Sequence, residues 1–178
     1  MKETLGIVVL LVALGWATQR LWSNPRPEPD SDWIGKQAPE FAEGSWINSP
    51  ALSLKALRGK VVVLEFWTFG CYNCRNTLPY VKQWYKKYAG PNFEIVGIHT
   101  PEFDREKVLK NVQREVERLG ITYPVVTDND YQTWERYNQR YWPVVYVLDK
   151  QGVIRYVHIG EGEYDETDRE IASLIAGR

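Results

Sequence analysis

The stretch from Val61 to Pro79, VVVLEFWTFGCYNCRNTLP, constrains the fold more than any other part of the chain. It opens with a continuous apolar run rich in β-branched residues, which is typical of a strand covered on both faces, as in a parallel sheet. Gly70 interrupts the run, and apolar residues then recur with a helical period at Leu78, Val81 and Tyr88. The sequence therefore predicts a buried strand that passes directly into a helix, with two cysteines at the junction.

Cys71 and Cys74 stand at the predicted start of this helix, and the chain has no other cysteine. Unpaired backbone N–H groups and the helix dipole favour an anion there, and a thiolate is such an anion. The free thiol has a pKa of about 8.5, which a helix N-terminus in a C-x-x-C motif commonly lowers to roughly 7 or less. Cys71 is therefore predicted to attack the sulfur of a partner, and Cys74 to resolve the mixed disulfide.

The motifs around the cysteines, taken together, resemble the thioredoxin superfamily. In that family an acid lies six residues before the first cysteine, a proline lies five residues after the second, and a cis-proline faces the disulfide. Glu65, Pro79 and Pro143 stand at the matching places. The opening from Ile34 to Phe41 resembles the redoxin and TlpA-like branch. The segments FWTFGC, GIHTPE and YWP resemble the thioredoxin-like domain of DipZ-type cytochrome c biogenesis proteins.

This resemblance runs from about Trp33 to the C-terminus and implies an α/β, thioredoxin-like fold, with a central mixed β-sheet flanked by helices. It implies a thiol–disulfide oxidoreductase without organic cofactor or metal. It also implies that the protein reduces disulfides in exported proteins, apocytochrome c among them, with electrons from a CcdA-like membrane protein. The implied catalytic residues are Cys71, Cys74, Glu65 and Pro143, and the implied substrate contacts are Trp67, Tyr72, Asn73 and Trp142.

Glu65 is predicted to take part in proton transfer. It shares the side of its strand with Val61 and Val63. If both faces of the sheet are covered, its carboxyl group is partly buried, its pKa rises, and it exchanges a proton with the active-site thiols. The alternative is a solvent-facing carboxylate at the end of the strand.

Two other uses of the cysteine pair remain open. One is a non-enzymatic metal-binding module, although a zinc site normally has four ligands and only His99 and His158 remain as nitrogen ligands. Both histidines are expected to be structural. The other is a thiol peroxidase of the AhpC/TSA type, because Thr68-x-x-Cys71 resembles the peroxiredoxin pattern. Leu64 stands where that pattern has a proline.

Residues 1–22 are predicted to form an N-terminal hydrophobic anchor helix. Thr4 to Gln19 carry no charge, and the apolar run is longer than the about 10–14 residues of a signal-peptide core but shorter than the about 20 of a full span. Leu21 and Trp22 extend it, and tryptophan suits a membrane interface, which favours an uncleaved anchor over a cleaved signal. Residues 23–32, rich in proline, are predicted to be a linker, and residues 33–178 the thioredoxin-like domain, facing the periplasm or another extracytoplasmic space.

The composition and the remaining patterns describe one globular domain. A hydrophobic content of 44% and eight tryptophans indicate a packed core, and a net charge of −1 provides no basic field for nucleic acid. An amphipathic helix is predicted at 104–119, with Val108 on its buried face and a Glu106–Lys110 pair on its outer side. A last helix is predicted to be capped by Thr167. The other predicted elements are strands at 93–99, 123–127, 144–148 and 153–159 and a short helix at 131–137.

Overall fold

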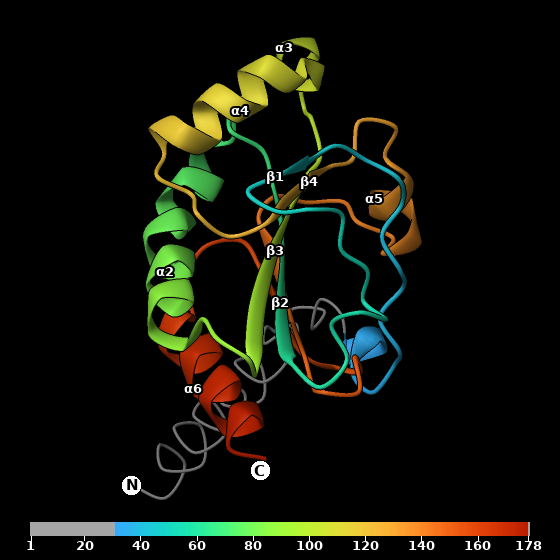
Figure 1. Ribbon diagram of the computed structural model, residues 1–178, viewed down its shortest axis with the longest axis vertical. Helices are drawn as coiled ribbons and strands as arrows, with labels where there is room; N and C mark the ends of the chain where they lie inside the picture. Colours follow the sequence, from blue (N-terminus) through green and yellow to red (C-terminus); the bar gives the residue numbers. More distant parts are fainter. Residues whose placement is uncertain (1–30, 178) are drawn as a thin grey trace, which may run out of the picture.

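The computed structural model describes residues 31–177 (Figure 1). The predicted anchor at residues 1–22 and most of the predicted linker at residues 23–32 lie outside the described residues. The described chain begins with a short 3-10 helix, η1 (Ser31–Trp33), which ends at the predicted start of the domain. Between residues 31 and 177, no helix is long and apolar enough to cross a membrane.

Six strands form one sheet in the order β1-β4-β3-β2-β5-β6. Neighbouring strands β2, β3 and β4 run parallel, whereas the β1–β4, β2–β5 and β5–β6 pairs are antiparallel. The predicted mixed sheet is therefore confirmed. The strands are β1 (Trp46–Ile47), β2 (Val61–Trp67), β3 (Phe93–His99), β4 (Val125–Thr127), β5 (Val144–Leu148) and β6 (Ile154–Ile159).

Helices cover both faces of this sheet, as Figure 1 shows. α2 and α6 lie along one face with α4 at one end of it, and α5 and η1 lie on the opposite face. This arrangement confirms the predicted thioredoxin-like layers. The helices are α2 (Tyr72–Tyr88), α3 (Asp104–Lys107), α4 (Leu109–Arg118), α5 (Gln132–Arg136) and α6 (Tyr164–Ile175).

The central strand β2 holds the two layers together, because all of its residues are buried. Val63 and Trp67 pack into a hydrophobic cluster that includes residues of α2, α4 and α6. The alternate side chains of Leu64 and Phe66 pack into a second cluster on the other face. Fully burying a large apolar side chain contributes about 1.5–3 kcal/mol, so a strand that is buried on both faces is a strong anchor for the domain.

The strand register brings three connecting segments to one end of the sheet. Trp67 pairs with His99, so the segments that follow β2 and β3 leave the sheet together. β5 is antiparallel to β2, and its first residue, Val144, pairs with Phe66. The turn before β5, which contains Pro143, therefore lies at this same end. Cys71, immediately before α2, is thus placed among segments that are far apart in the sequence.

Two predictions for the helices are wrong. The single helix expected at 104–119 is divided into α3 and α4, because Val108 adopts an extended conformation with φ −78° and ψ 108°. Val108 is exposed, and Glu106, expected on the outer side, is fully buried. The last helix begins at Tyr164 rather than after Thr167. Thr167 is buried within that helix, where its hydroxyl donates a hydrogen bond to the Glu163 carbonyl oxygen.

Candidate active site

The two cysteines form a disulfide at the start of α2, with their Cα atoms 5.3 Å apart. Cys71 is the N-cap residue, and its Sγ accepts a hydrogen bond from the Cys74 backbone N–H at 3.1 Å. Cys71 is half-buried, whereas Cys74 is completely buried. A partner's sulfur can therefore approach only Cys71, and the helix start favours the thiolate form of that residue once the disulfide is reduced.

Pro143 follows a cis peptide bond from Trp142, as predicted. Pro143 is buried, and Trp142 is half-buried and packs against the same hydrophobic cluster as Cys71. The Trp142 ring also lies 4.2 Å from that of Trp134, centroid to centroid. The turn before β5 is therefore fixed by aromatic packing beside the cysteine pair, and the catalytic role of Pro143 stays a prediction.

The predicted substrate contacts separate into exposed and buried residues. Tyr72, with 70% of its surface exposed, and Asn73 project from the first turn of α2 and are open to a partner. Trp67 is fully buried in the core, so the prediction that it contacts a substrate is wrong. It shares its side of β2 with Val63 and Glu65, and this side faces the helices rather than the solvent.

Glu65 is fully buried and is hydrogen-bonded to a tyrosine. The Tyr123 hydroxyl donates to Glu65 Oε2 at 2.7 Å, and Glu65 Oε1 has no partner. Burial raises the pKa of Glu65 to about 7, and the hydrogen bond from Tyr123 partly opposes this rise. Burial, and next the Glu65 charge, raise the pKa of Tyr123 well above its usual value, so the hydroxyl keeps its proton. The pair can therefore take up or release a proton at Glu65 near neutral pH.

The raised pKa of Glu65 predicts a pH dependence of stability. Between about pH 4.5 and 7, the folded protein holds a proton that the unfolded chain releases, so this group lowers the free energy of unfolding as the pH rises. The expected loss is roughly 3 kcal/mol at pH 8 relative to pH 4. Urea unfolding of the oxidised protein should show it as a difference between wild type and Glu65→Gln.

The comparison with Glu65→Gln is needed because His99 acts in the opposite direction. Burial lowers the pKa of His99 from 6.5 to about 4, and the neighbouring Glu106 charge only partly opposes this. The folded protein therefore binds fewer protons than the unfolded chain between these values, and stability rises with pH from this group. Equal pH slopes for wild type and variant would contradict the assignment to Glu65.

A second buried polar cluster lies against the turn before Cys71 and was not predicted from the sequence. The Thr68 hydroxyl donates to Glu106 Oε2 at 2.7 Å and lies 3.2 Å from His99 Nε2. All three residues are buried. A glutamate at the third position of a helix is typical of a capping box, and that signal was available in the sequence. It was weakened because the N-cap position is occupied by Phe103 rather than serine or threonine.

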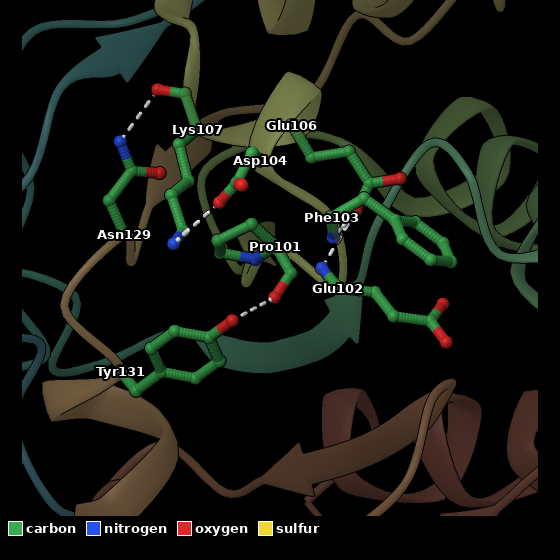
Figure 2. Close-up of polar contacts among 8 residues, drawn as sticks. All are labelled: Pro101, Glu102, Phe103, Asp104, Glu106, Lys107, Asn129 and Tyr131. Atoms are coloured by element: carbon green, nitrogen blue, oxygen red, sulfur yellow. Dashed lines mark hydrogen bonds and ion pairs between the residues drawn. The ribbon is translucent and has the colours of Figure 1, made fainter.

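The segment from Pro101 to Lys107, which follows β3 and includes α3, carries Glu106 and is held at both ends (Figure 2). The Tyr131 hydroxyl donates to the Pro101 carbonyl oxygen, and Asn129 donates to the Lys107 carbonyl oxygen. Lys107 also pairs with Asp104 at 3.1 Å. This segment is therefore attached at its beginning and its end to the residues that follow β4.

The two histidines considered as metal ligands each have other polar neighbours. In the part of the chain that the structure describes, no three or more His, Cys, Asp or Glu side chains come together to hold a metal ion. Nδ1 of His158, on β6, lies 3.4 Å from Glu163 Oε2. His99 belongs to the buried cluster with Thr68 and Glu106. Both histidines therefore have structural neighbours that account for their positions.

Comparison with known proteins agrees with this geometry. The AhpC/TSA family model matches residues 34–157. The chain belongs to this family. Protein DipZ of Mycobacterium bovis is 42% identical over 133 residues, which are 73% of this chain and 19% of the relative. The thiol-disulfide oxidoreductase ResA of Geobacillus kaustophilus is 28% identical over 168 residues, which are 94% of this chain and 91% of the relative.

The solved structures show the same fold. A thiol:disulfide interchange protein DsbE from Chlorobium tepidum superposes with a TM-score of 0.70 and 23% identity, covering 80% of this chain and 97% of that one. The chain thus spans nearly all of this structure, but only about a fifth of the length of the DipZ proteins. The comparisons thus show a member of the AhpC/TSA family with a thioredoxin-like fold, and the structure adds a C-x-x-C disulfide at the start of α2.

Proposed function

We propose that the protein reduces disulfides in exported proteins on the outer side of a membrane to which residues 1–22 attach it. The observation that supports this most is the asymmetry of the couple. Cys71 is accessible at the helix start, whereas Cys74 is buried in a hydrophobic cluster. The same cluster contains Val63 and Trp67, which lie on either side of Glu65 on one face of β2. An accessible nucleophile and a buried resolving thiol near a group that titrates at about pH 7 suit a disulfide reductase.

The proposed cycle transfers two electrons. The Cys71 thiolate attacks one sulfur of the substrate disulfide, and the other substrate sulfur leaves as a thiolate that takes up a proton. Cys74 loses its proton, for which Glu65 is the proposed acceptor, and attacks Cys71 Sγ. The Cys71–Cys74 disulfide forms and the second substrate thiol is released. A dithiol donor must then reduce the couple, and a CcdA-like membrane protein is the proposed donor.

The reduction potential of the couple tests the direction of this reaction. A value near that of thioredoxin, about −270 mV, would mark the protein as a reductant, and a value near −120 mV would mark it as an oxidant. Equilibration with thiol redox buffers, read by alkylation and mass spectrometry, gives this value. A parallel assay should follow the thiols that the reduced protein releases from a protein disulfide substrate. An oxidising potential without such release would contradict the proposal.

The membrane attachment gives a second prediction. If residues 1–22 are retained, the full chain should remain with the membrane fraction, and mass spectrometry should find the intact N-terminus. A high-salt wash should not release it, since a hydrophobic segment does not depend on exposed charges. Soluble protein beginning near Thr18 would show that the segment is a cleaved signal. The same fractionation should be performed on cells that lack a CcdA-like protein. If residues 1–22 alone attach the protein, it should remain with the membrane fraction there, even though its supply of electrons is lost.

The peroxidase alternative is disfavoured by the position of Thr68. Its hydroxyl is buried and donates to Glu106, so it is not free to bind a peroxide beside Cys71. We therefore expect peroxide consumption to be slow compared with disulfide reduction when both are measured with the same thiol donor. Faster turnover of peroxide than of a protein disulfide would favour the alternative.

A further inference from the structure

The carboxylate of Glu106 is built into the site behind Cys71 and has no role in the cycle described above. One of its oxygens, Oε2, accepts hydrogen bonds from the Thr68 hydroxyl at 2.7 Å and from the backbone N–H groups of Glu102 and Phe103 at 2.7 and 3.2 Å. Figure 2 shows the Glu106 side chain folded back onto this backbone, while the Glu102 side chain points away from it. All three donors complement a negative charge.

The second oxygen of this carboxylate faces the cysteine turn. Glu106 Oε1 is buried without a hydrogen-bond partner. A Cβ atom at Gly70 would overlap it, so the carboxylate lies against the main chain of the residue that precedes Cys71. The Cys71 backbone N–H, in turn, donates to the Thr68 carbonyl oxygen at 3.3 Å. The Glu106 carboxylate is thus connected to the turn that carries Cys71 in two ways. It is hydrogen-bonded to Thr68, and it lies in close contact with Gly70.

The charged groups around this carboxylate form no ion pair with it among residues 31–177. Burial lowers the pKa of His99, which faces it from β3, to about 4, so the imidazole is neutral at neutral pH. Arg105, on the same helix, is exposed and lies over the Phe103 ring at 5.3 Å, but a Cβ atom at Gly70 would also lie 3.2 Å from its Nη2, so this guanidinium reaches the same point of the turn. The Glu106 oxygen is buried and lies closer to Gly70 than the exposed guanidinium does, so its negative charge is expected to have the larger effect on the cysteine turn.

We propose that Glu106 is a positioning residue that holds the turn before Cys71 and, through its negative charge, opposes the Cys71 thiolate and makes the Cys71–Cys74 couple more reducing. A helix start alone stabilises the thiolate and with it the reduced protein, which makes a couple more oxidising. A buried carboxylate behind the same turn acts against this effect. The proposal deepens the proposed function, on which its biological direction rests, because it assigns to one residue the bias toward disulfide reduction.

The test compares three forms of the full chain. Glu106→Gln keeps the hydrogen-bond acceptor and removes the charge, and Glu102→Gln removes a charge from the exposed side of the same segment as a matched control. We expect Glu106→Gln to lower the pKa of the Cys71 thiol by about one unit, read from thiolate absorbance near 240 nm against pH. The equilibrium constant with glutathione should shift toward the dithiol by up to about tenfold, or about 30 mV. Glu102→Gln should match wild type.

Thr68→Val distinguishes an effect of the Glu106 charge on Cys71 from an effect of fixing the turn by a hydrogen bond. It removes the Thr68–Glu106 hydrogen bond, which Glu106→Gln keeps, and leaves the Glu106 charge, so it should not shift the Cys71 pKa downward. An unchanged pKa and potential in a folded Glu106→Gln protein would overturn the proposal, as would equal shifts in Glu106→Gln and Thr68→Val. If Glu106→Gln does not fold, Gly70→Ala replaces it, because its methyl group should displace the carboxylate from the turn. An unchanged Cys71 pKa in that variant would count equally against the proposal.

These readouts do not depend on a protein substrate. The pKa and the potential are differences between purified proteins, so they stand even if the wild type proves to be an oxidant. An oxidising wild type would contradict the proposed function alone, and a missing difference for Glu106→Gln would contradict this inference alone.

Discussion

Serine in place of Cys74 is expected to leave the protein covalently joined to its substrates, and serine in place of Cys71 to abolish disulfide reduction. Cys71 is the accessible sulfur, and Cys74 is fully buried one helical turn away. Without Cys74, the mixed disulfide at Cys71 can form but cannot be resolved from within the protein. Without Cys71, no thiolate reaches a substrate. The expected loss of turnover is on the order of 10³-fold or more, as for removal of a nucleophile elsewhere.

Non-reducing electrophoresis followed by mass spectrometry measures both outcomes. The Cys74→Ser protein should give adducts that disappear on addition of dithiothreitol, and the Cys71→Ser protein should give none. The double variant is the matched control for adducts that form by chance. Equal alkylation rates of the two thiols in the reduced wild type from pH 5 to 9 would contradict the assignment of Cys71 as nucleophile. Equal adduct yields from the two single variants would contradict it as well.

The strand–helix junction could be predicted because its signals are local. The apolar run of β2 and the helical period of α2 both lie within the stretch from Val61 to Tyr88, and the structure has both elements there. The strand predicted at 93–99 is observed over the same residues. The position of Pro143 beside the cysteines could not be predicted from local signals, because only the antiparallel pairing of β5 with β2 brings this turn to the site. It was inferred from the family resemblance and not from any local pattern.

The errors arose where tertiary contacts override a local period. Trp67 lies on the same side of β2 as Glu65, so the alternation that predicted the burial of Glu65 also predicts the burial of Trp67. The family resemblance nevertheless led to the prediction that Trp67 contacts a substrate. Glu106 was placed outside because the spacing of Val112 and Val116 defines the inner face of α4. The helix is broken at Val108, and Glu106 turns inward to its hydrogen-bond donors. A helical period cannot show that a helix is interrupted or that a carboxylate finds buried partners.

Glutamine in place of Glu65 should slow the resolution of the mixed disulfide by at least about tenfold near pH 7. Cys74 must lose a proton in a fully buried position, and burial without a partner disfavours its thiolate. Glu65 has a pKa raised to about 7 by burial, so near neutrality it is partly ionised and can accept that proton. General base catalysis of this kind contributes about 10²–10⁴-fold. Glutamine still accepts the Tyr123 hydrogen bond but does not titrate.

The pH dependence distinguishes this role from a structural one. The defect of Glu65→Gln should shrink as the pH rises and Cys74 ionises unaided, whereas formation of the mixed disulfide through Cys71 should be unaffected. Tyr123→Phe keeps the carboxylate but removes the hydrogen bond that lowers its pKa, so the pH profile of resolution should move to higher pH. Stopped-flow single turnovers with a model disulfide measure both steps. A resolution rate for Glu65→Gln equal to wild type from pH 6 to 8 would leave Glu65 with a structural role only.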